Sequence, residues 1–212
     1  MESIIQKIII LTIPVLLAIT LHEFAHGWVA NRLGDPTARL LGRLTLNPIK
    51  HLDPIGTLAF FLTGMIGWAK PVPVNILQLK DPKKDMMWIA LAGPLTNIFL
   101  AVVSALFLKF LSITGLTYNF SLLSVIRPIY LMAQASVIIN VGLAIFNIIP
   151  VPPLDGSRIL TGLLPYRQAL TFSRIEPYGF MILIGLMFTG IVHMVISPIV
   201  YLIVGILLGG RL

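Results

Sequence analysis

The sequence predicts an all-α membrane protein that crosses the bilayer several times. Of its 212 residues, 57% are hydrophobic and only 11% are charged, and the mean hydropathy is +0.96. Apolar runs of about 20 residues, the length that spans a bilayer as a helix, occur more than once. Soluble domains carry about 25% charged residues on average. The composition therefore excludes a soluble enzyme, a disordered chain and a DNA-binding domain.

Four apolar segments are long enough to cross a membrane. We expect them to form one integral membrane domain that covers residues 1–212. The first three suit single spans, whereas the last is too long for one straight helix. The four segments are residues 4–29, 86–109, 128–150 and 178–208.

Prolines are expected to interrupt two of these segments. Gly93-Pro94 falls early in the second segment, and Ser197-Pro198 falls late in the fourth. Proline removes a helical hydrogen bond and clashes with the preceding turn. We therefore expect the fourth segment to kink at Ser197-Pro198, or to divide there into a span and a shorter re-entrant piece.

The chain between the first two spans, about residues 38–76, is expected to form a small flap. Residues 38–46 alternate roughly between polar and apolar side chains, and the proline-broken residues 69–75 resemble an edge strand. Residues 55–68 are apolar but too few for a full crossing. We therefore expect a re-entrant element with a β-hairpin-like flap, sheltered beside a cavity because irregular backbone cannot face lipid.

Lysine and arginine are distributed unequally among the connecting segments. Eleven lie in residues 31–85 and in the loop after the third span, whereas the opposite side holds three or four: Lys7, Lys109, Arg127 and, if the chain ends on that side, Arg211. Because cytoplasmic loops are enriched in these residues, we expect a multi-pass plasma-membrane protein with its N-terminus outside. The net charge of +7 follows from these loops, and without a basic run interleaved with aromatics no nucleic-acid partner is expected.

The sequence His22-Glu23-Phe24-Ala25-His26 lies inside the first apolar segment. Histidines at positions i and i+4 share one helical face, so both imidazoles can reach one zinc ion. Glu23 follows the first histidine and can act as a general base toward a water molecule. Charged and polar groups inside a span are costly, and this cluster therefore indicates a functional site.

Two histidines leave a zinc site without its third protein ligand. The chain has no cysteine, and His51, Asp53, His193 and Glu176 are weaker candidates. Asp155 follows the prolines that end the third span, on the same predicted side as His26, and precedes Gly156, which permits a sharp turn or a close approach. Asp155 is therefore the preferred third ligand.

The segments HEFAHGW, AGPLTN and NIIPVPPLDGSRIL occur in this order over most of residues 20–160. In these segments the chain resembles the site-2 protease family of intramembrane zinc metalloproteases, in the short form without a PDZ or CBS domain. The resemblance implies a three-helix core formed by the first three spans. It also implies that His22, His26 and Asp155 bind one Zn²⁺ per chain and that Glu23 is the catalytic base.

Three further groups of residues have assigned roles with less support. Asn147 could donate to the developing oxyanion, although an interhelical hydrogen bond is a rival role. Gly93, Pro94 and Asn97 are expected to pack the helices of the core. The extended segment could pair with an unwound substrate by strand addition; its residues are Lys70, Pro71, Val72, Pro73, Val74 and Asn75.

The sequence thus predicts an intramembrane zinc endopeptidase that cleaves membrane-spanning protein substrates in the lipid bilayer near the cytoplasmic face. One alternative is a membrane metal transporter, which should place its ligands along a path through the bilayer. A second is a non-catalytic, metal-dependent binder of membrane proteins. A third is an unrelated membrane metalloprotease that takes Glu176 as its third ligand.

Overall fold

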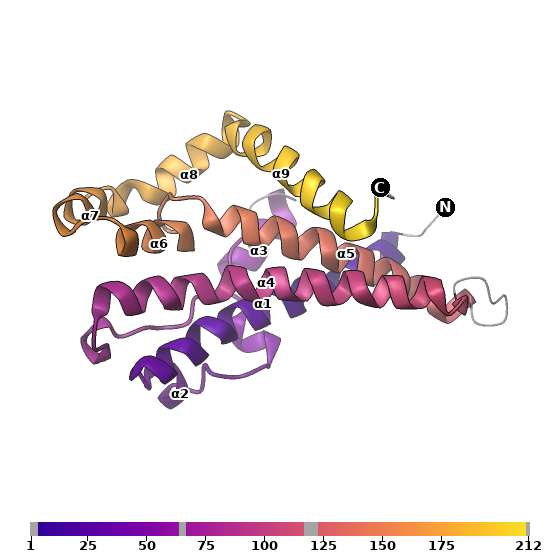
Figure 1. Cartoon of the computed structure of the whole chain (residues 1–212), viewed down its shortest axis with the longest axis horizontal. Coiled ribbons are helices and arrows are strands. Elements are labelled where there is room, and N and C mark those ends of the chain that lie inside the picture. The colour runs from indigo at the N-terminus through magenta and orange to yellow at the C-terminus, as the bar shows by residue number, and fades with distance from the viewer. Residues whose placement is uncertain (1–3, 64–66, 117–122, 211–212) are drawn as a thin grey trace. The chain divides into compact units, whose positions relative to one another are not determined.

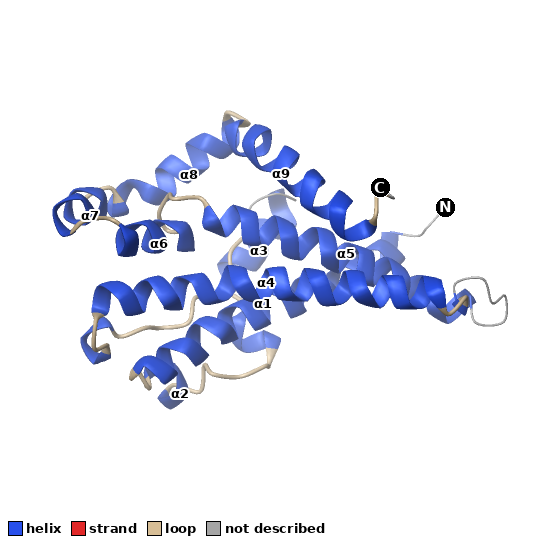
Figure 2. Cartoon of the chain, viewed as in Figure 1, coloured by secondary structure: helices blue, strands red, loops and turns tan. Residues whose placement is uncertain are grey.

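The computed structural model describes residues 4–63, 67–116 and 123–210. These residues form helices joined by loops and turns and include no β-strand, as Figure 2 shows, so the all-α prediction is confirmed. The α-helices, labelled in Figure 1, are α1 (Ile4–Leu33), α2 (Thr37–Leu40), α3 (Pro54–Thr63), α4 (Pro82–Ile113), α5 (Leu123–Ile148), α6 (Asp155–Leu163), α7 (Tyr166–Ser173), α8 (Gly179–Phe188) and α9 (Ile191–Leu208).

Four of these helices, α1 from Ile8 onward, α4, α5 and α9, are long and apolar enough to cross a membrane. The chain is therefore a multi-pass membrane protein, as expected. The helix α3 has 10 residues, which is shorter than the roughly 17 to 25 needed for a crossing. It falls within the apolar stretch expected to be re-entrant, which also includes residues outside the described part.

The prolines do not break the helices where the sequence suggested. Pro94 lies inside a continuous α4, and Pro198 lies inside a continuous α9. The fourth apolar segment divides instead at Gly190, whose φ of +74° is left-handed backbone that glycine adopts without steric cost. Membrane helices tolerate proline because neighbouring groups satisfy the freed backbone carbonyl. The expected interruption of the second segment at Gly93-Pro94 and the expected division of the fourth segment at Ser197-Pro198 were therefore wrong.

The described helices divide into two compact units. Unit 1 comprises residues 1–18, 97–146 and 185–212, and unit 2 comprises residues 19–96 and 147–184. The boundary falls inside α1, α4 and α5, so each of these helices contributes to both units.

Unit 1 is a helical bundle with small residues in its core. Buried Ala101 and Ala105 of α4 pack with Ala133 and Val137 of α5 and with Val204 of α9. Without a hydrophobic driving force between helices in lipid, close approach of small residues is a main source of association. The composition of this core therefore suits a bundle inside a membrane.

A buried polar network also connects the helices of unit 1. The Asn97 amide donates to the Ala18 carbonyl oxygen at 3.3 Å and to Asn140 Oδ1 at 2.8 Å. Asn140 in turn donates to the Ser136 carbonyl oxygen at 2.8 Å, and the hydroxyls of Ser136 and Ser104 are 2.8 Å apart. These bonds join α1, α4 and α5 through groups that are buried or partly buried.

In the described part of the flap region, residues 38–63 and 67–76, unit 2 has no β-hairpin. The segment expected to begin a strand at residue 38 starts instead in α2, and the described flap has a single antiparallel bridge, between Leu52 and Ala69. Residues 70–75, which we call the strap, have no regular secondary structure and form no strand. Pro71 and Pro73 have no N–H to donate, and side chains bind several of the remaining backbone groups, as described below.

Charge and tryptophan are concentrated in unit 2. It holds eleven of the fifteen lysines and arginines and all three tryptophans of the chain. Trp28 and Trp88 are about half exposed, at 45% and 53%, and the Arg32 guanidinium lies 5.0 Å from the centre of the Trp28 ring. Amphipathic tryptophan rings are typical of the boundary between membrane and water.

Candidate metal centre and active site

Three metal-ligating side chains converge inside unit 2. His22 and His26 lie one turn apart on α1, and Asp155 is the first residue of α6. Asp155 Oδ2 lies 3.1 Å from His22 Nε2 and 3.3 Å from His26 Nε2, and the two ring nitrogens are 3.0 Å apart. All three residues are at most 9% exposed. Residues 129 positions apart in the chain thus share one buried centre.

A backbone carbonyl fixes the orientation of His26. Its Nδ1 lies 2.7 Å from the carbonyl oxygen of Ile89 on α4, a distance at which Nδ1–H donates a hydrogen bond. This bond places the proton of the neutral ring on Nδ1, so that Nε2 presents its lone pair to the centre. The same pattern orients metal-bound histidines in general.

Gly93 allows α4 to lie directly against both imidazoles. A Cβ atom at this position would be 2.5 Å from His22 Cε1 and 2.6 Å from His26 Cε1. Any other residue would therefore push the rings apart. The sequence predicted a packing role for Gly93, and the structure places that packing on the two histidines themselves.

A close turn positions Asp155. The α5 helix ends at Ile148, and a proline-containing loop leads to α6. A Cβ at Gly156 would lie 2.1 Å from the Ile148 carbonyl oxygen, so only glycine permits this approach. Burial by itself would raise the pKa of the Asp155 carboxyl, but its contacts with the His22 and His26 rings hold that pKa below the usual range.

These residues fit a zinc ion. Asp155 Oδ2 is buried, and no described residue donates a hydrogen bond to it. It faces two imidazole nitrogens, one of which carries a lone pair because of the Ile89 bond. Two histidine nitrogens and one carboxylate oxygen are ligands that zinc prefers in catalytic sites, where a fourth position remains for water. A cation would satisfy the buried oxygen that the protein leaves unpaired.

Glu23 adjoins this centre and is held by the strap. Its Oε2 accepts a hydrogen bond of 2.9 Å from the backbone N–H of Val72. The Val72 side chain packs against Gly27, one turn along α1, where a Cβ would lie 3.1 Å from Val72 Cγ1. The strap therefore lies against the same helix that supplies both histidines.

Two charged residues, Arg43 and Asp35, anchor the strap. Neither was predicted from the sequence as a site residue. Arg43 Nη2 donates to the carbonyl oxygens of Lys70 at 2.8 Å and Pro71 at 3.3 Å. The fully buried Asp35 accepts from the N–H of Asn75 at 2.7 Å. Arg43 lay in a segment interpreted as a strand, and Asp35 in a Gly-Asp-Pro turn, so no spacing in the sequence related either residue to the strap.

Comparison with known proteins gives the family. The model of peptidase family M50 matches residues 10–127 and 119–190. The protein named "Putative zinc metalloprotease YwhC" of Bacillus subtilis is 36% identical over 89% of this chain and 84% of its own length. The chain belongs to peptidase family M50.

Two further relatives are less similar in sequence. "Putative zinc metalloprotease Rip2" of Mycolicibacterium smegmatis is 27% identical over 88% of this chain and 69% of its own. "Zinc metalloprotease MJ0392" of Methanocaldococcus jannaschii is 27% identical over 91% of this chain and 47% of its own. No solved structure shows significant similarity. This M50 peptidase is accordingly a zinc metalloprotease of the site-2 protease type.

The alternative ligands of this M50 peptidase lie elsewhere. Among the described residues, His22, His26 and Asp155 are the one group of three metal-ligating side chains. His51 is buried with Nε2 2.8 Å from the Thr45 carbonyl oxygen, and His193 lies 3.0 Å from the Ser197 hydroxyl. The remaining two candidates have other surroundings: Asp53 accepts from the N–H of Gly56, and Glu176 is exposed in a short 3-10 turn.

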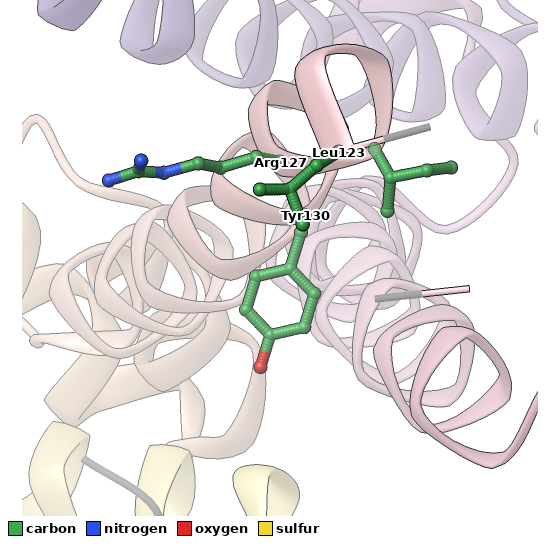
Figure 3. Close-up of a pocket in the computed structure, with 4 residues that line it drawn as sticks. Leu123, Arg127 and Tyr130 are labelled. Carbon is green, nitrogen blue, oxygen red and sulfur yellow. The ribbon is translucent and has the colours of Figure 1, made fainter. Parts of the chain in front are cut away.

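A cavity of about 340 Å³ at the start of α5 lies in unit 1 and is separate in sequence from these residues. Leu123, Ile126, Arg127 and Tyr130 line it, and Figure 3 shows the Arg127 and Tyr130 side chains extending in different directions. None of the residues predicted for the peptidase site lines this cavity.

Proposed function

We propose that this M50 peptidase is an intramembrane endopeptidase that binds one Zn²⁺ per chain and hydrolyses peptide bonds of membrane-spanning proteins near the cytoplasmic face. One observation carries the proposal. His22, His26 and Asp155 converge at a buried centre beside Glu23, and both histidines and Glu23 lie on a helix long and apolar enough to cross a membrane. In this proposal these three residues hold the zinc ion and Glu23 is the general base.

The chemistry divides between the metal and the chain. When bound, zinc supplies a Lewis acid that polarises a carbonyl oxygen and makes a water molecule more acidic. Glu23 removes a proton from the attacking water, whose oxygen forms a bond with the scissile carbonyl carbon. As the carbon–nitrogen bond breaks, Glu23 returns this proton to the leaving amine.

Substrate would lie between Glu23 and the end of α5. A membrane-spanning helix must unwind before cleavage, because its carbonyl groups are bonded within the helix. The strap beside Glu23 offers backbone groups to which an unwound segment could pair as an added strand. Asn147, one residue before α5 ends, is placed in the proposal as a donor to the developing oxyanion.

The distribution of charge supports a site close to the cytoplasmic surface of the cell membrane. The site lies in unit 2, with most of the lysines and arginines, and cytoplasmic segments are enriched in these residues. Trp28 follows His26 by two residues, and Trp88 directly precedes Ile89. Tryptophan at the level of the histidines favours the membrane–water boundary, where the path for hydrolytic water is short.

Metal analysis and cleavage together test this proposal. We expect one zinc per chain in the detergent-purified wild type and in Glu23→Gln, and loss of zinc in Asp155→Ala. Glu176→Ala is the matched carboxylate control and should retain zinc. Two single-span model peptides serve as substrates, one a continuous leucine-alanine helix and one of equal length with a Gly-Asn-Pro break near its cytoplasmic end.

Wild type should cleave the broken peptide and spare the continuous helix, while Glu23→Gln should cleave neither. Turnover by Glu23→Gln would overturn the assigned base. Zinc retained in Asp155→Ala but lost in Glu176→Ala would reassign the third ligand. A wild type that bound zinc and cleaved neither peptide would overturn the membrane-spanning substrate class.

A further inference from the structure

We propose that Arg43 positions the general base by holding the peptide unit between Pro71 and Val72. The inference rests on the proposed function, in which Glu23 is that base. It starts from two hydrogen bonds made by the same peptide unit: the Val72 N–H donates to Glu23 Oε2, and the Pro71 carbonyl oxygen accepts from Arg43 Nη2. Arg43 is a positioning residue in this proposal, because it acts on Glu23 through the peptide.

The geometry of a peptide bond makes this arrangement directional. The Pro71–Val72 bond is trans, so its carbonyl and N–H groups point in opposite directions. A cation at the carbonyl and a carboxylate at the N–H are therefore aligned with the dipole of the peptide. Hydrogen bonds in such a chain polarise and strengthen one another. The guanidinium of Arg43 thus supports the bond that holds Glu23.

The surrounding chain limits the movement of this peptide unit. Pro71 and Pro73 have fixed φ angles and also favour extended backbone at the residues that precede them. Arg43 binds the Lys70 carbonyl as well, at 2.8 Å, and the packing of Val72 on Gly27 fixes the distance to α1. Buried Asp35 holds the other end of the strap at Asn75. The Val72 N–H is therefore presented to Glu23 from a pre-organised segment.

This arrangement has a consequence for catalysis. One oxygen of the Glu23 carboxylate is held by Val72, which leaves Oε1 to receive the proton of the attacking water. A carboxylate without this bond can rotate, and misplacement of a catalytic group by about 1 Å can reduce a rate about 100-fold. Loss of Arg43 should therefore reduce kcat, with little change in KM or in zinc binding.

The test compares Arg43→Gln with Arg39→Gln in the zinc-loaded full chain, using the helix-broken model peptide as substrate. Arg39 is an exposed arginine of α2 that carries the same charge but makes no bond to the strap. We expect kcat to fall about 10- to 100-fold in Arg43→Gln, with KM changed less than about twofold and one zinc retained. Arg43→Lys keeps a charged donor and should recover part of kcat, and Arg39→Gln should match the wild type.

A double-mutant cycle tests whether the effect passes through the peptide. Val72→Pro removes the N–H that Glu23 accepts, and it keeps extended backbone in a segment that already contains two prolines. If Arg43 acts through this N–H, the loss caused by Arg43→Gln should nearly vanish in the Val72→Pro background. Zinc content and thermal unfolding show whether each variant is folded, and the three Arg43 and Arg39 single variants decide the proposal if Val72→Pro does not fold.

Several results would overturn the inference. A kcat equal to the wild type in Arg43→Gln, or an equal loss in Arg39→Gln, would remove the role of Arg43. A raised KM at unchanged kcat would make Arg43 a substrate-binding residue, and zinc loss would make it a purely structural one. An undiminished Arg43→Gln effect in the Val72→Pro background would exclude the peptide route. Turnover by Glu23→Gln is a different result, since it would refute the base assignment itself.

Discussion

The two histidines of the metal centre depend on a residue that has no side chain. Because a Cβ at Gly93 would lie 2.5 to 2.6 Å from atoms of both rings, the α4 backbone forms one wall of the site. The Ile89 carbonyl, one turn earlier on α4, orients His26 from the same side. The position of α4 therefore determines the distance between the two imidazoles.

Replacing Gly93 by alanine should release zinc. The added methyl group must displace His22 or His26, and a metal site accepts errors in ligand position of only a few tenths of an ångström. We expect zinc affinity to fall at least about 10-fold, the range seen when residues supporting metal ligands are removed. Titration with a competing chelator measures the zinc affinity of each variant.

Gly142→Ala is the matched control, because Gly142 also lies within a long helix and a Cβ there meets no described atom within 4 Å. It should retain zinc and cleavage. Equal zinc affinity in Gly93→Ala and Gly142→Ala would contradict the close approach of α4 to the histidines.

At the scale of single residues, the metal-ligand pattern could be predicted from the sequence, but the residues that hold the strap beside the site could not. The spacing of His22 and His26 predicted one helical face, and the structure brings Asp155 to it. Arg43 and Asp35 escaped notice because their partners are backbone groups of the strap, about 30 to 40 residues away. A hydrogen bond to a main-chain carbonyl or N–H needs no particular residue at the other end, and it leaves no pairing pattern in one sequence.

At the scale of helices, the amide of Asn97 connects α1, α4 and α5 of unit 1. Interhelical hydrogen bonds in membranes contribute about 0.6 kcal/mol on average and up to about 1.7 kcal/mol. We expect Asn97→Ala to lower the free energy of unfolding by about 1 to 2 kcal/mol, near the upper end because the buried side-chain oxygen Oδ1 of Asn140 then loses its donor. Reversible unfolding in mixed micelles measures this loss.

Asn140→Ala completes a cycle with Asn97→Ala. If the two amides bind each other as described, the double variant should lose less stability than the two single losses combined. Strict additivity of the two losses would contradict the bond between Asn97 and Asn140.

The break between α8 and α9 shows where sequence reasoning about elements failed. Proline was expected to kink or divide the fourth apolar segment, but Pro198 lies inside a continuous α9, and the segment divides at Gly190, which precedes α9 with left-handed backbone. The number of long helices could be predicted from the lengths of the apolar segments, which do not depend on how the helices pack. The position of a break depends on which unfavourable backbone conformations the packed helices stabilise, and one sequence does not show this.

Gly190→Ala and Pro198→Ala distinguish a break at Gly190 from a break at Pro198. A left-handed residue with a side chain costs roughly 1 to 2 kcal/mol, so Gly190→Ala should lower the free energy of unfolding by about that amount. Pro198→Ala restores a helical N–H and should leave this free energy unchanged or raise it. The reverse order of the two variants in an unfolding titration would support a break at the proline.

At the scale of the whole molecule, the absence of cysteine makes orientation measurable. Single cysteines can replace Lys84 and Arg167, two exposed positions of unit 2, and Lys109 of unit 1. If cytoplasmic segments carry the excess of lysine and arginine, a membrane-impermeant thiol reagent added to intact cells should label the cysteine at 109. The cysteines at 84 and 167 should react only after the membrane is opened.

The Lys84→Cys and Arg167→Cys variants control for each other, because both lie in unit 2 and should react alike. Labelling of both in intact cells, with the cysteine at 109 protected, would invert the proposed orientation. It would place the proposed active site outside the cytoplasm.

The confinement of all three tryptophans to unit 2 gives this protein an internal optical probe. Trp28 and Trp88 flank His26 and Ile89 in sequence, and Trp68 lies two residues before the strap. Tryptophan emission from the unlabelled protein, excited at wavelengths that tyrosine does not absorb, therefore comes from the half that contains the metal centre and not from unit 1. Metal loading can be followed by tryptophan fluorescence without a reporter group.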